Sequence, residues 1–553
     1  MGTETSILNE VAKTGLASLE IRSPFTIPSG IVTTVPSVLA RIAREVPEIG
    51  FLTTKTLSLM PREGYREPVL YEYYPGCFVN AVGLANPGAH EFVRVMRPLL
   101  PLHDKKPLVV SIMGGNAEEF LECAQVLDPI ADAFELNLSC PHVKGAGQCV
   151  GTDPDGVRRI VQLLKRYTKK PVIPKLSPNL GDIGFMAKLC EEEGADALCL
   201  INTVGPGIAC DTEGNPILSN VVGGLSGAGI LPIGLKSVRE AASQVKIPII
   251  AEGGIRLPED VAAYRAAGAS LFGVGSALAG MTTPEISAYF RTLVLDAPTR
   301  KACPVVLPFS GTRTAYFKTK VVENTSIGPG LFKVTLENGS PCDSGQFFFL
   351  RLPGIGEKPF SPAQDVPPAY FVRTVGPFTR ALERLRPGDP LYMRGPYGKG
   401  FPEPPAGVPL VLVAGGTGLA PIMMAAEKWK DRVARTFVGF STDVTPEFRR
   451  EITARMPGAH IVLDPPGSPG EVVRRLAKDV TQEKELYQAS RVFICGPEAM
   501  MNATVEVLDT YVSRNRIFTA REDIMRCGIG VCGSCGTPSG LRSCVDGPVM
   551  HPG

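Results

Sequence analysis

Short apolar runs alternate with amphipathic stretches through the first half of the chain. The apolar runs span Leu108–Met113, Ala133–Asn137, Val172–Leu176, Ala197–Asn202, Pro248–Glu252 and Ser270–Gly275, and the amphipathic stretches span Asp155–Tyr167, Ile183–Glu193, Leu235–Gln244 and Leu257–Ala267. Repeated βα units of this kind predict a (β/α)8 barrel over residues 1–305, with its active site at the C-terminal ends of the strands. A doubly wound sheet gives a similar alternation and stays open on the pattern alone.

The pattern changes to a period of two in the second half of the chain, after a proline-rich linker at Ala302–Pro308. Short strands at regular intervals predict an antiparallel β-barrel over residues 306–405. The alternating runs span Ala315–Glu323, Gly330–Glu337, Gln346–Leu352, Ala369–Val375 and Pro390–Arg394. The stretch Pro409–Pro421 then predicts a buried strand, a glycine-rich turn and a helix, which is typical of an α/β nucleotide-binding domain over residues 406–515.

Four cysteines near the end of the chain carry the clearest chemical signal. Cys527, Cys532, Cys535 and Cys544 have the C-x4-C-x2-C…C spacing that holds a [2Fe–2S] cluster. A four-thiolate zinc site is the first alternative, but such sites usually have two separated C-x2-C pairs and only one is present here. A pair of disulfides is the second. We therefore predict a small cluster domain over residues 516–553, which needs one electron donor and one acceptor.

Composition narrows the classes of partner and the compartment. The 553 residues carry a net charge of +2, so nothing indicates nucleic acid or an anionic membrane as a partner. The sequence holds no run of about 18 apolar residues and does not begin with a signal peptide. Its 14 cysteines in a chain of this length do not indicate a disulfide scaffold, and a cluster needs reduced thiols. We expect a cytoplasmic protein without a membrane segment.

Polar residues follow the predicted strands of the first half, where a barrel gathers its active site. They are Asn137, Lys175, Asn202 and Thr203. Two glycine-bearing loops, Gly253-Gly254 and Gly275-Ser276, stand where a barrel commonly binds phosphate, which favours a phosphate-bearing cofactor over ordinary tight turns.

Cys140 follows a strand and precedes a glycine-rich loop, which suits a general base or nucleophile. His142, two residues on, suits a base or a hydrogen-bonding wall.

Several stretches of the first half resemble the NAD-linked class 1 (B-type) dihydroorotate dehydrogenases. They are Asn80–Gly88, Asn137–Lys144, Gly151–Asp153, Lys175–Asn179, Ile201–Thr203 and Gly223–Gly227. The resemblance implies a TIM barrel that holds FMN, in which Cys140 removes a proton from the dihydropyrimidine while a hydride leaves for the flavin. The implied substrate residues are Lys55, Asn80, Val82, Gly83, Leu84, Asn137, His142, Asn202 and Thr203. The implied FMN residues are Ser29, Gly30, Lys55, Thr56, Asn80, Asn137, Lys175, Ile201, Gly227, Gly253, Gly254, Gly275 and Ser276.

One residue departs from the pattern of that family. Many members carry asparagine where this chain has His142, and a Ser-Cys-Pro-His run also resembles dihydropyrimidine dehydrogenase, which acts on uracil and thymine. The Val-Lys-Gly continuation and Gly-Thr-Asp-Pro favour dihydroorotate. Oxidation of dihydrouracil or dihydrothymine is therefore an alternative activity.

The second half resembles the ferredoxin–NADP reductase superfamily, and with the cysteine loop it resembles the FAD- and [2Fe–2S]-bearing electron-transfer subunit of the same enzyme. The implied FAD residues are Lys358, Pro359, Phe360, Ser361 and Gly376, where a lysine stands in place of the usual arginine. The implied NAD residues are Gly415, Gly416, Gly418, Asp443, Cys495, Gly496 and Pro497. Arg449 and Arg450 leave NADP open as an alternative.

Together these patterns predict the two subunits fused in one chain, with electrons passing from FMN through the cluster to FAD and NAD+. We expect the partners to be dihydroorotate, orotate and NAD, and we expect a homo-oligomer, a dimer of fused chains. A second alternative is an electron-transfer protein that uses FMN only as a relay and serves a separate partner.

Overall fold

Eight strands in the first half of the chain form one parallel sheet. A computed structural model describes residues 15–138, 150–294, 313–465 and 469–552. The chain divides into two compact units, Met1–Arg313 with Ile529–Gly540, and Thr314–Gly528 with Leu541–Gly553.

The barrel strands are β1 (Phe25–Thr26), β2 (Leu52–Thr53), β5 (Leu108–Ile112), β6 (Ala133–Asn137), β7 (Val172–Leu176), β8 (Leu198–Leu200), β11 (Ile249–Glu252) and β12 (Leu271–Gly273).

The sheet runs β1-β12-β11-β8-β7-β6-β5-β2, with every neighbouring pair parallel. Its two ends meet at a parallel bridge between Phe25 and Ile49, where the Gly50 N–H donates to the Phe25 carbonyl at 2.9 Å. The sequence therefore predicts the eight-stranded parallel α/β barrel correctly, and the doubly wound alternative is wrong.

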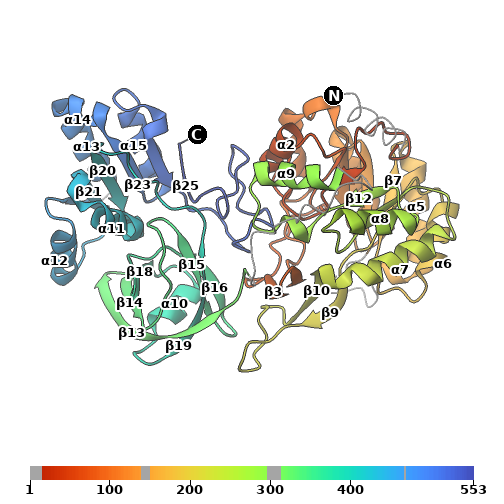
Figure 1. The fold of residues 1–553 in the computed structure, drawn as a ribbon, viewed down its shortest axis with the longest axis horizontal. Helices are drawn as coiled ribbons and strands as arrows, with labels where there is room; N and C mark the ends of the chain where they lie inside the picture. Colours follow the sequence, from red (N-terminus) through yellow and green to blue (C-terminus); the bar gives the residue numbers. More distant parts are fainter. Residues whose placement is uncertain (1–14, 139–149, 295–312, 466–468, 553) are drawn as a thin grey trace. The chain divides into compact units, whose positions relative to one another are not determined.

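Helices follow the strands and cover the outside of the barrel (Figure 1). Their bounds are α2 (Pro36–Glu45), α3 (Ala89–Met96), α4 (Ala117–Leu127), α5 (Pro154–Tyr167), α6 (Ile183–Glu192), α7 (Leu231–Ala242), α8 (Pro258–Ala266) and α9 (Thr283–Val294). Helix α5 shows why such a stretch forms a helix. Its cap residue Asp153 accepts from two backbone N–H groups, and its apolar residues recur every three or four positions, so one face is buried.

The interior of the barrel is layered because side chains of a strand point alternately inward and outward. The layer at the N-terminal end is an apolar cluster that includes Phe51, Val109, Ala133, Ile173, Ala197, Ile250 and Leu271. Two residues further along the strands stand polar groups, among them Ser111, Glu135, Lys175 and Glu252, all buried. The apolar layer keeps water away from these polar groups on that side.

A separate antiparallel sheet of four strands borders the C-terminal end of the barrel strands. Its order is β3 (Leu70–Tyr74), β4 (Cys77–Asn80), β10 (Val222–Gly227), β9 (Val204–Ile208). Asn80 ends β4 and pairs with Gly224 of β10. This sheet therefore brings two distant segments that were singled out in the sequence, at residues 80 and 223–227, to the same place.

The segment Ile529–Gly540 belongs to the barrel unit although it lies more than 200 residues from it in sequence. The Val32 N–H donates to the Val531 carbonyl at 2.8 Å, and the Thr34 hydroxyl donates to the Cys532 carbonyl at 2.7 Å. The Ser37 hydroxyl donates to the Thr537 carbonyl at 2.7 Å. Part of the predicted cluster domain thus packs on the loop that precedes α2 and on the first turn of that helix.

The second unit contains two sheets. An antiparallel sheet of seven strands runs β16 (Gly356–Phe360), β15 (Phe347–Leu352), β19 (Pro390–Tyr397), β13 (Phe317–Gly328), β14 (Leu331–Leu336), β18 (Pro368–Arg373), β17 (Gln364–Asp365), and is accompanied by α10 (Pro377–Glu383). A sheet of six strands runs β22 (His460–Leu463), β21 (Val433–Phe440), β20 (Leu410–Gly415), β23 (Arg491–Cys495), β24 (Ile517–Ala520), β25 (Val549–Met550), with β25 alone antiparallel to its neighbour.

The helices of this six-stranded part are α11 (Leu419–Lys428), α12 (Pro446–Arg455), α13 (Glu471–Gln482), α14 (Lys484–Ala489) and α15 (Glu498–Leu508). The antiparallel sheet ends, in chain order, with β19, and parallel pairing in this unit begins with β20, while the predicted domain boundaries stay predictions. Among the described residues, no helix is both long enough and apolar enough to cross a membrane.

Candidate active site

A cavity of about 750 Å³ opens at the C-terminal ends of the barrel strands, within the range of small-molecule sites. Its lining includes flavin and substrate residues expected from the sequence, namely Ser29, Gly30, Lys55, Thr56, Asn80, Val82, Gly83, Leu84, Asn137, Lys175, Ile201, Asn202, Thr203, Gly227, Gly253, Gly254, Gly275 and Ser276. Cys140 and His142 lie outside the described residues. The structure thus gathers the described candidates in one place, while their binding roles stay predictions.

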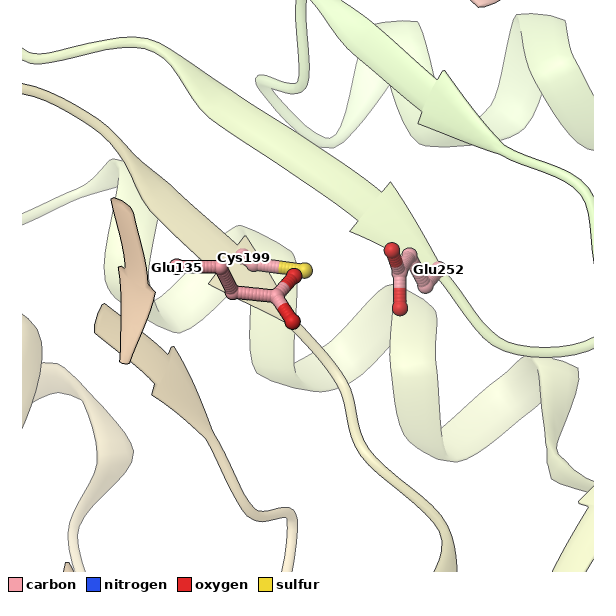
Figure 2. A group of neighbouring side chains, drawn as sticks. All are labelled: Glu135, Cys199 and Glu252. Carbon is pink, nitrogen blue, oxygen red and sulfur yellow. The ribbon is translucent and has the colours of Figure 1, made fainter. Parts of the chain in front are cut away.

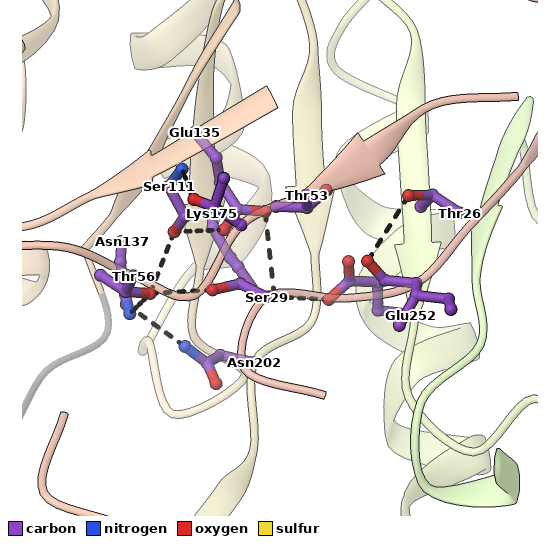
Figure 3. A network of polar contacts seen from close by, with 12 residues as sticks. Thr26, Ser29, Thr53, Thr56, Ser111, Glu135, Asn137, Lys175, Asn202 and Glu252 are labelled. Carbon is purple, nitrogen blue, oxygen red and sulfur yellow. Dashed lines mark hydrogen bonds and ion pairs between the residues drawn. The ribbon is translucent and has the colours of Figure 1, made fainter. Parts of the chain in front are cut away.

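A row of hydroxyl and amide groups connects one wall of the cavity to the barrel interior (Figure 3). The Ser29 and Thr56 hydroxyls lie 3.0 Å apart, and the Thr56 and Ser111 hydroxyls also lie 3.0 Å apart. The Asn137 amide donates to Thr56 Oγ1 at 3.0 Å, and the Asn202 amide donates to Asn137 Oδ1 at 3.4 Å. These bonds fix the orientation of the amides that the sequence assigns to a pyrimidine ring, which offers both donors and acceptors.

Lys175 lies at the floor of the cavity between two buried carboxylates (Figure 3). Its ammonium is 2.5 Å from Glu252 Oε2 and 3.9 Å from Glu135 Oε2. Burial lowers the pKa of Lys175, but attraction to Glu135 and Glu252 outweighs burial, so the net shift is upward. Lys175 is therefore a fixed positive charge, which suits a flavin whose polar edge becomes more negative on reduction.

The predicted substrate loop Val82–Leu84 is held by a neighbouring segment that sequence reasoning missed. The Tyr65 N–H donates to the Val82 carbonyl at 3.1 Å, and Arg62 forms an antiparallel bridge with Asn86. Residues 61–65 also line the cavity. No strand-like pattern marks this segment, so its part in the wall follows only from tertiary pairing.

Close backbone approach explains one glycine of the cavity. A Cβ on Gly224 would lie 2.1 Å from the Thr203 hydroxyl oxygen, far inside contact distance. The Asn80 amide donates to the Gly224 carbonyl at 3.3 Å. Gly224 therefore lets β10 pass beside the residues expected to hold the substrate.

Val531 and Cys532 also line the cavity. Gly533, with φ +65°, leaves no room for a side chain, because a Cβ there would lie 2.4 Å from the Val32 carbonyl oxygen. Sequence reasoning assigned Cys532 to a cluster only, and nothing in the pattern indicated that its loop forms part of the barrel's cavity wall.

The predicted FAD residues of the second unit lie around the end of one strand. Lys358, Pro359 and Phe360 end β16, and Ser361 follows. Gly376 precedes α10, and the Phe360 ring stacks on Phe378 of that helix with centroids 6.2 Å apart. The motif and Gly376 are therefore neighbours in space, and their binding of FAD stays a prediction.

The predicted NAD residues gather at the C-terminal ends of β20 and β23. Gly415 ends β20, Gly416 and Gly418 form the turn before α11, and Cys495 ends β23. A Cβ on Gly418 would lie 2.5 Å from the Cys495 backbone, so close packing alone requires that glycine. Gly496 and Pro497 follow β23, and Asp443 follows β21 with an exposed side chain. Arg449 lies 3.6 Å from Asp443.

The predicted cluster ligands Cys527, Cys532, Cys535 and Cys544 are all buried, and their binding of a cluster stays a prediction. Arg394 holds the backbone beside the first of them, since its guanidinium donates to the Cys527 carbonyl at 2.8 Å. Arg394 is itself fully buried and makes two bonds to Glu357, at 2.6 and 3.0 Å. Sequence reasoning missed Arg394, although a charged residue inside an apolar strand is a signal for a buried ion pair.

Replacing Arg394 with methionine is expected to destabilise the second unit by about 3–5 kcal/mol, because Glu357 would be left as a buried, unpaired charge. Urea unfolding followed by circular dichroism measures the change. The matched control is Arg450→Met, whose ion pair with Glu447 is exposed and contributes less than about 1 kcal/mol. The double variant Arg394→Met/Glu357→Gln should recover part of the loss. Equal stability of Arg394→Met and Arg450→Met would contradict this account.

Comparison with known proteins adds to this geometry. The dihydroorotate dehydrogenase family profile matches residues 11–288. A profile described as the iron–sulfur cluster binding domain of dihydroorotate dehydrogenase B matches residues 522–552.

Several similar curated proteins are catalytic subunits of dihydroorotate dehydrogenase B (NAD(+)). That of Pyrococcus abyssi is 42% identical over 266 residues, which cover 48% of this chain and 86% of the relative. That of Methanothermobacter thermautotrophicus is 39% identical over 269 residues, or 48% and 86% of the two chains. That of Geobacter sp. (strain M21) is 42% identical over 236 residues, or 42% and 76%. Because the family profile covers half of the chain and these relatives are matched over most of their own length, the chain belongs to the dihydroorotate dehydrogenase family, and it carries an iron–sulfur cluster binding domain near its C-terminal end.

Proposed function

We propose that this chain is a self-contained, NAD-linked dihydroorotate dehydrogenase. It oxidises dihydroorotate to orotate at the barrel cavity, and the electrons pass through FMN, the [2Fe–2S] cluster and FAD to NAD+. The proposed domains are an FMN barrel (1–305), an FAD domain (306–405), an NAD domain (406–515) and a cluster domain (516–553). The fusion joins a catalytic and an electron-transfer subunit in one polypeptide, and we propose that two such chains form a dimer.

One observation carries this proposal. The cavity that gathers the flavin and substrate candidates is lined in part by Val531 and Cys532, which belong to the segment matched by the iron–sulfur profile. A cluster ligand on the wall of a flavin cavity supports direct electron transfer between the two. This favours a coupled oxidoreductase over a flavin relay that serves a separate partner.

The residues of the cavity fit FMN and a dihydropyrimidine. Gly253 and Gly254 both have positive φ and line the cavity beside Gly275 and Ser276, so that backbone rather than bulky side chains faces a phosphate. When bound, FMN would accept the hydride from the substrate. Lys175 would stabilise the added charge.

A further set of barrel residues would hold the substrate and remove its proton. The amides of Asn80, Asn137 and Asn202, with Thr203, would hold its polar edge. Cys140 Sγ would take the proton from the ring carbon next to the one that loses the hydride, so that the carbon–carbon double bond of orotate forms.

In the second unit, the Lys358–Ser361 motif and Gly376 would bind FAD, and the loops at Gly415–Gly418 and Cys495–Pro497 would bind the pyridine nucleotide. Asp443 would accept from a ribose hydroxyl, which favours NAD. The cluster held by Cys527, Cys532, Cys535 and Cys544 would pass single electrons between the two flavins, because a flavin exchanges both electron pairs and single electrons.

Anaerobic titration with dihydroorotate tests the proposal. Absorbance of the flavins and of the cluster should bleach together, and NADH should form when NAD+ is added. Dihydrouracil, which lacks the carboxylate, serves as the matched control and should bleach neither. Bleaching by dihydrouracil alone would support a dihydropyrimidine dehydrogenase, and bleaching by neither compound would support an electron-transfer relay.

A further inference from the structure

Glu135 is a buried carboxylate for which the proposed mechanism has no use. It stands on β6, between Lys175 of β7 and Ser111 of β5, and is only 2% exposed. Its Oε1 accepts the Ser111 hydroxyl at 2.7 Å, while its Oε2 is 3.9 Å from the Lys175 ammonium. A carboxylate in so dry a place needs a reason, because burial of an unpaired charge is costly.

A metal site is one possible reason, and the geometry argues against it. Ligand atoms of Glu135, Cys199 and Glu252 lie within 4.8 Å of one another and face a common space (Figure 2). The Lys175 ammonium, 2.5 Å from Glu252, already supplies a cation to this group and would repel a second one. Burial, followed by the charge of Glu252, also raises the pKa of the Cys199 thiol well above its ordinary value, whereas a metal needs the thiolate.

The charges of this cluster do not balance when both carboxylates are ionised. Lys175 contributes one positive charge, and Glu252 neutralises it at contact distance. An ionised Glu135 would add one uncompensated negative charge directly behind the cavity. Among the described residues, the titratable groups that act on Glu135 are Lys175, Glu252 and Cys199. Burial raises the pKa of Glu135, Lys175 opposes that shift and Glu252 adds to it, so that the net direction is upward.

The row of hydroxyls Ser29, Thr56 and Ser111 connects Glu135 to the cavity. The direction in which these hydroxyls donate their hydrogen bonds follows from the number of hydrogens that each one has. Each hydroxyl has one hydrogen to donate. Ser111 donates to Glu135, so in the Thr56–Ser111 pair Thr56 must be the donor. Ser29 must then donate to Thr56, which also accepts from Asn137. The three hydroxyls, whose row Figure 3 shows, therefore all donate in the direction from the cavity wall toward Glu135, as transfer of a proton inward requires.

We propose that Glu135 is a redox-linked proton acceptor, which binds one proton when the flavin in the cavity is reduced and releases it on reoxidation, through Ser29, Thr56 and Ser111. The inference rests on the proposed binding of FMN. Glu135 takes its proton from solvent in the cavity, while the proton that the substrate loses goes to Cys140 Sγ and returns to solvent when that thiol ionises again, so that the protons balance. Charge is the driving force, since protonation of Glu135 offsets the negative charge that reduction adds above Lys175.

The dependence of the flavin reduction potential on pH tests the acceptor. Uptake of a proton on reduction makes the potential fall as pH rises. Around neutral pH, the wild-type slope should be steeper than that of Glu135→Gln by one proton per electron pair. This is a tenfold change in the equilibrium constant per pH unit, or about 30 mV for a two-electron couple. Glutamine keeps the shape of the side chain and cannot take the proton. Equal slopes would overturn the proposal.

A second measurement remains decisive if Glu135→Gln does not fold. In the infrared difference spectrum of the wild type, reduction should produce the C=O stretch of a protonated carboxyl group, and absence of this band would overturn the proposal. Failure of the proposed function would give a different result from failure of the Glu135 proposal. The purified protein would then lack FMN, or dihydroorotate would not reduce the bound FMN. FMN that is bound and reduced, with equal slopes, contradicts only the role of Glu135.

Interruption of the hydroxyl row tests the path. Ser111→Ala should leave the pH dependence of the potential unchanged, because the equilibrium does not depend on the route. Proton uptake from solvent, followed with a pH indicator in stopped flow with NADH as the reductant, should slow at least about tenfold. Ser237→Ala is the matched control, a buried serine that donates to the Ile233 carbonyl at 2.9 Å. An unchanged uptake rate in Ser111→Ala would overturn the proposed route.

Discussion

Replacing Cys140 with serine is expected to slow the oxidation of dihydroorotate at least about 100-fold, because a serine hydroxyl is a far weaker base than a thiolate for the proton that the substrate must lose. Reduction of an artificial acceptor by NADH should continue at the wild-type rate, since that reaction needs only the second half of the chain. Steady-state orotate formation and NADH-dependent dye reduction measure the two activities in the same preparation.

Cys210→Ser is the matched control for this variant. Cys210 is exposed and does not contribute to the cavity lining, so its replacement should alter neither activity. If Cys140→Ser kept full orotate formation, the base would have to be another group, with His142 as the next candidate. If both activities fell together, the variant would have lost its fold or its cofactors rather than its base.

Replacing Cys532 with alanine is expected to abolish electron flow between dihydroorotate and NAD+ while each half-reaction continues. Loss of one thiolate removes or disables the cluster, which alone connects the two flavins in the proposed path. Dihydroorotate should still bleach the FMN absorbance, and NADH should still bleach that of FAD. Iron content, the electron paramagnetic resonance signal of the reduced cluster and overall turnover measure the effect.

Cys532 is both a proposed cluster ligand and part of the cavity wall. A variant of a second proposed cluster cysteine therefore separates the effect on the cluster from the effect on the cavity. Cys535 is buried and does not contribute to the lining; Cys535→Ala should therefore uncouple the halves without disturbing FMN. Cys342→Ala, in a cysteine outside the cluster spacing, is the control and should leave turnover unchanged. Continued electron flow in both Cys532→Ala and Cys535→Ala would rule out the cluster as the connection.

The barrel was largely predictable from the sequence, because its central strands are buried on both faces and read as uninterrupted apolar runs. Strands β6 and β7 match the predicted bounds at both ends. Strands β1 and β2 were not predicted, since each has only two residues and too little pattern to detect. Strand β10 was missed for another reason: four of its six residues are glycine or serine, which read as a loop until β4 pairs with it.

The cavity lining was predictable where residues follow strands or match a family motif, as Asn137 and Asn202 do. The buried polar layer behind the cavity lining was not predictable. Glu135 lies between Phe134 and Leu136, where the apolar neighbours indicate burial, yet nothing in the sequence shows that Lys175 stands beside it. The partner of a buried charge comes from another strand, and barrel register decides which one. For the same reason the contact of Thr34 with Cys532 could not be anticipated from local sequence.

The packing of Ile529–Gly540 within the barrel unit has a consequence for how the enzyme responds to dilution. When a wall of a cofactor site comes from a separate subunit, mass action sets the fraction of sites that are complete. Here the wall segment is tethered to the barrel by the same polypeptide, so its effective concentration is fixed by chain length and does not fall with protein concentration. The cavity should therefore stay complete at any cellular abundance, and synthesis of one chain ensures one cluster loop for each flavin site.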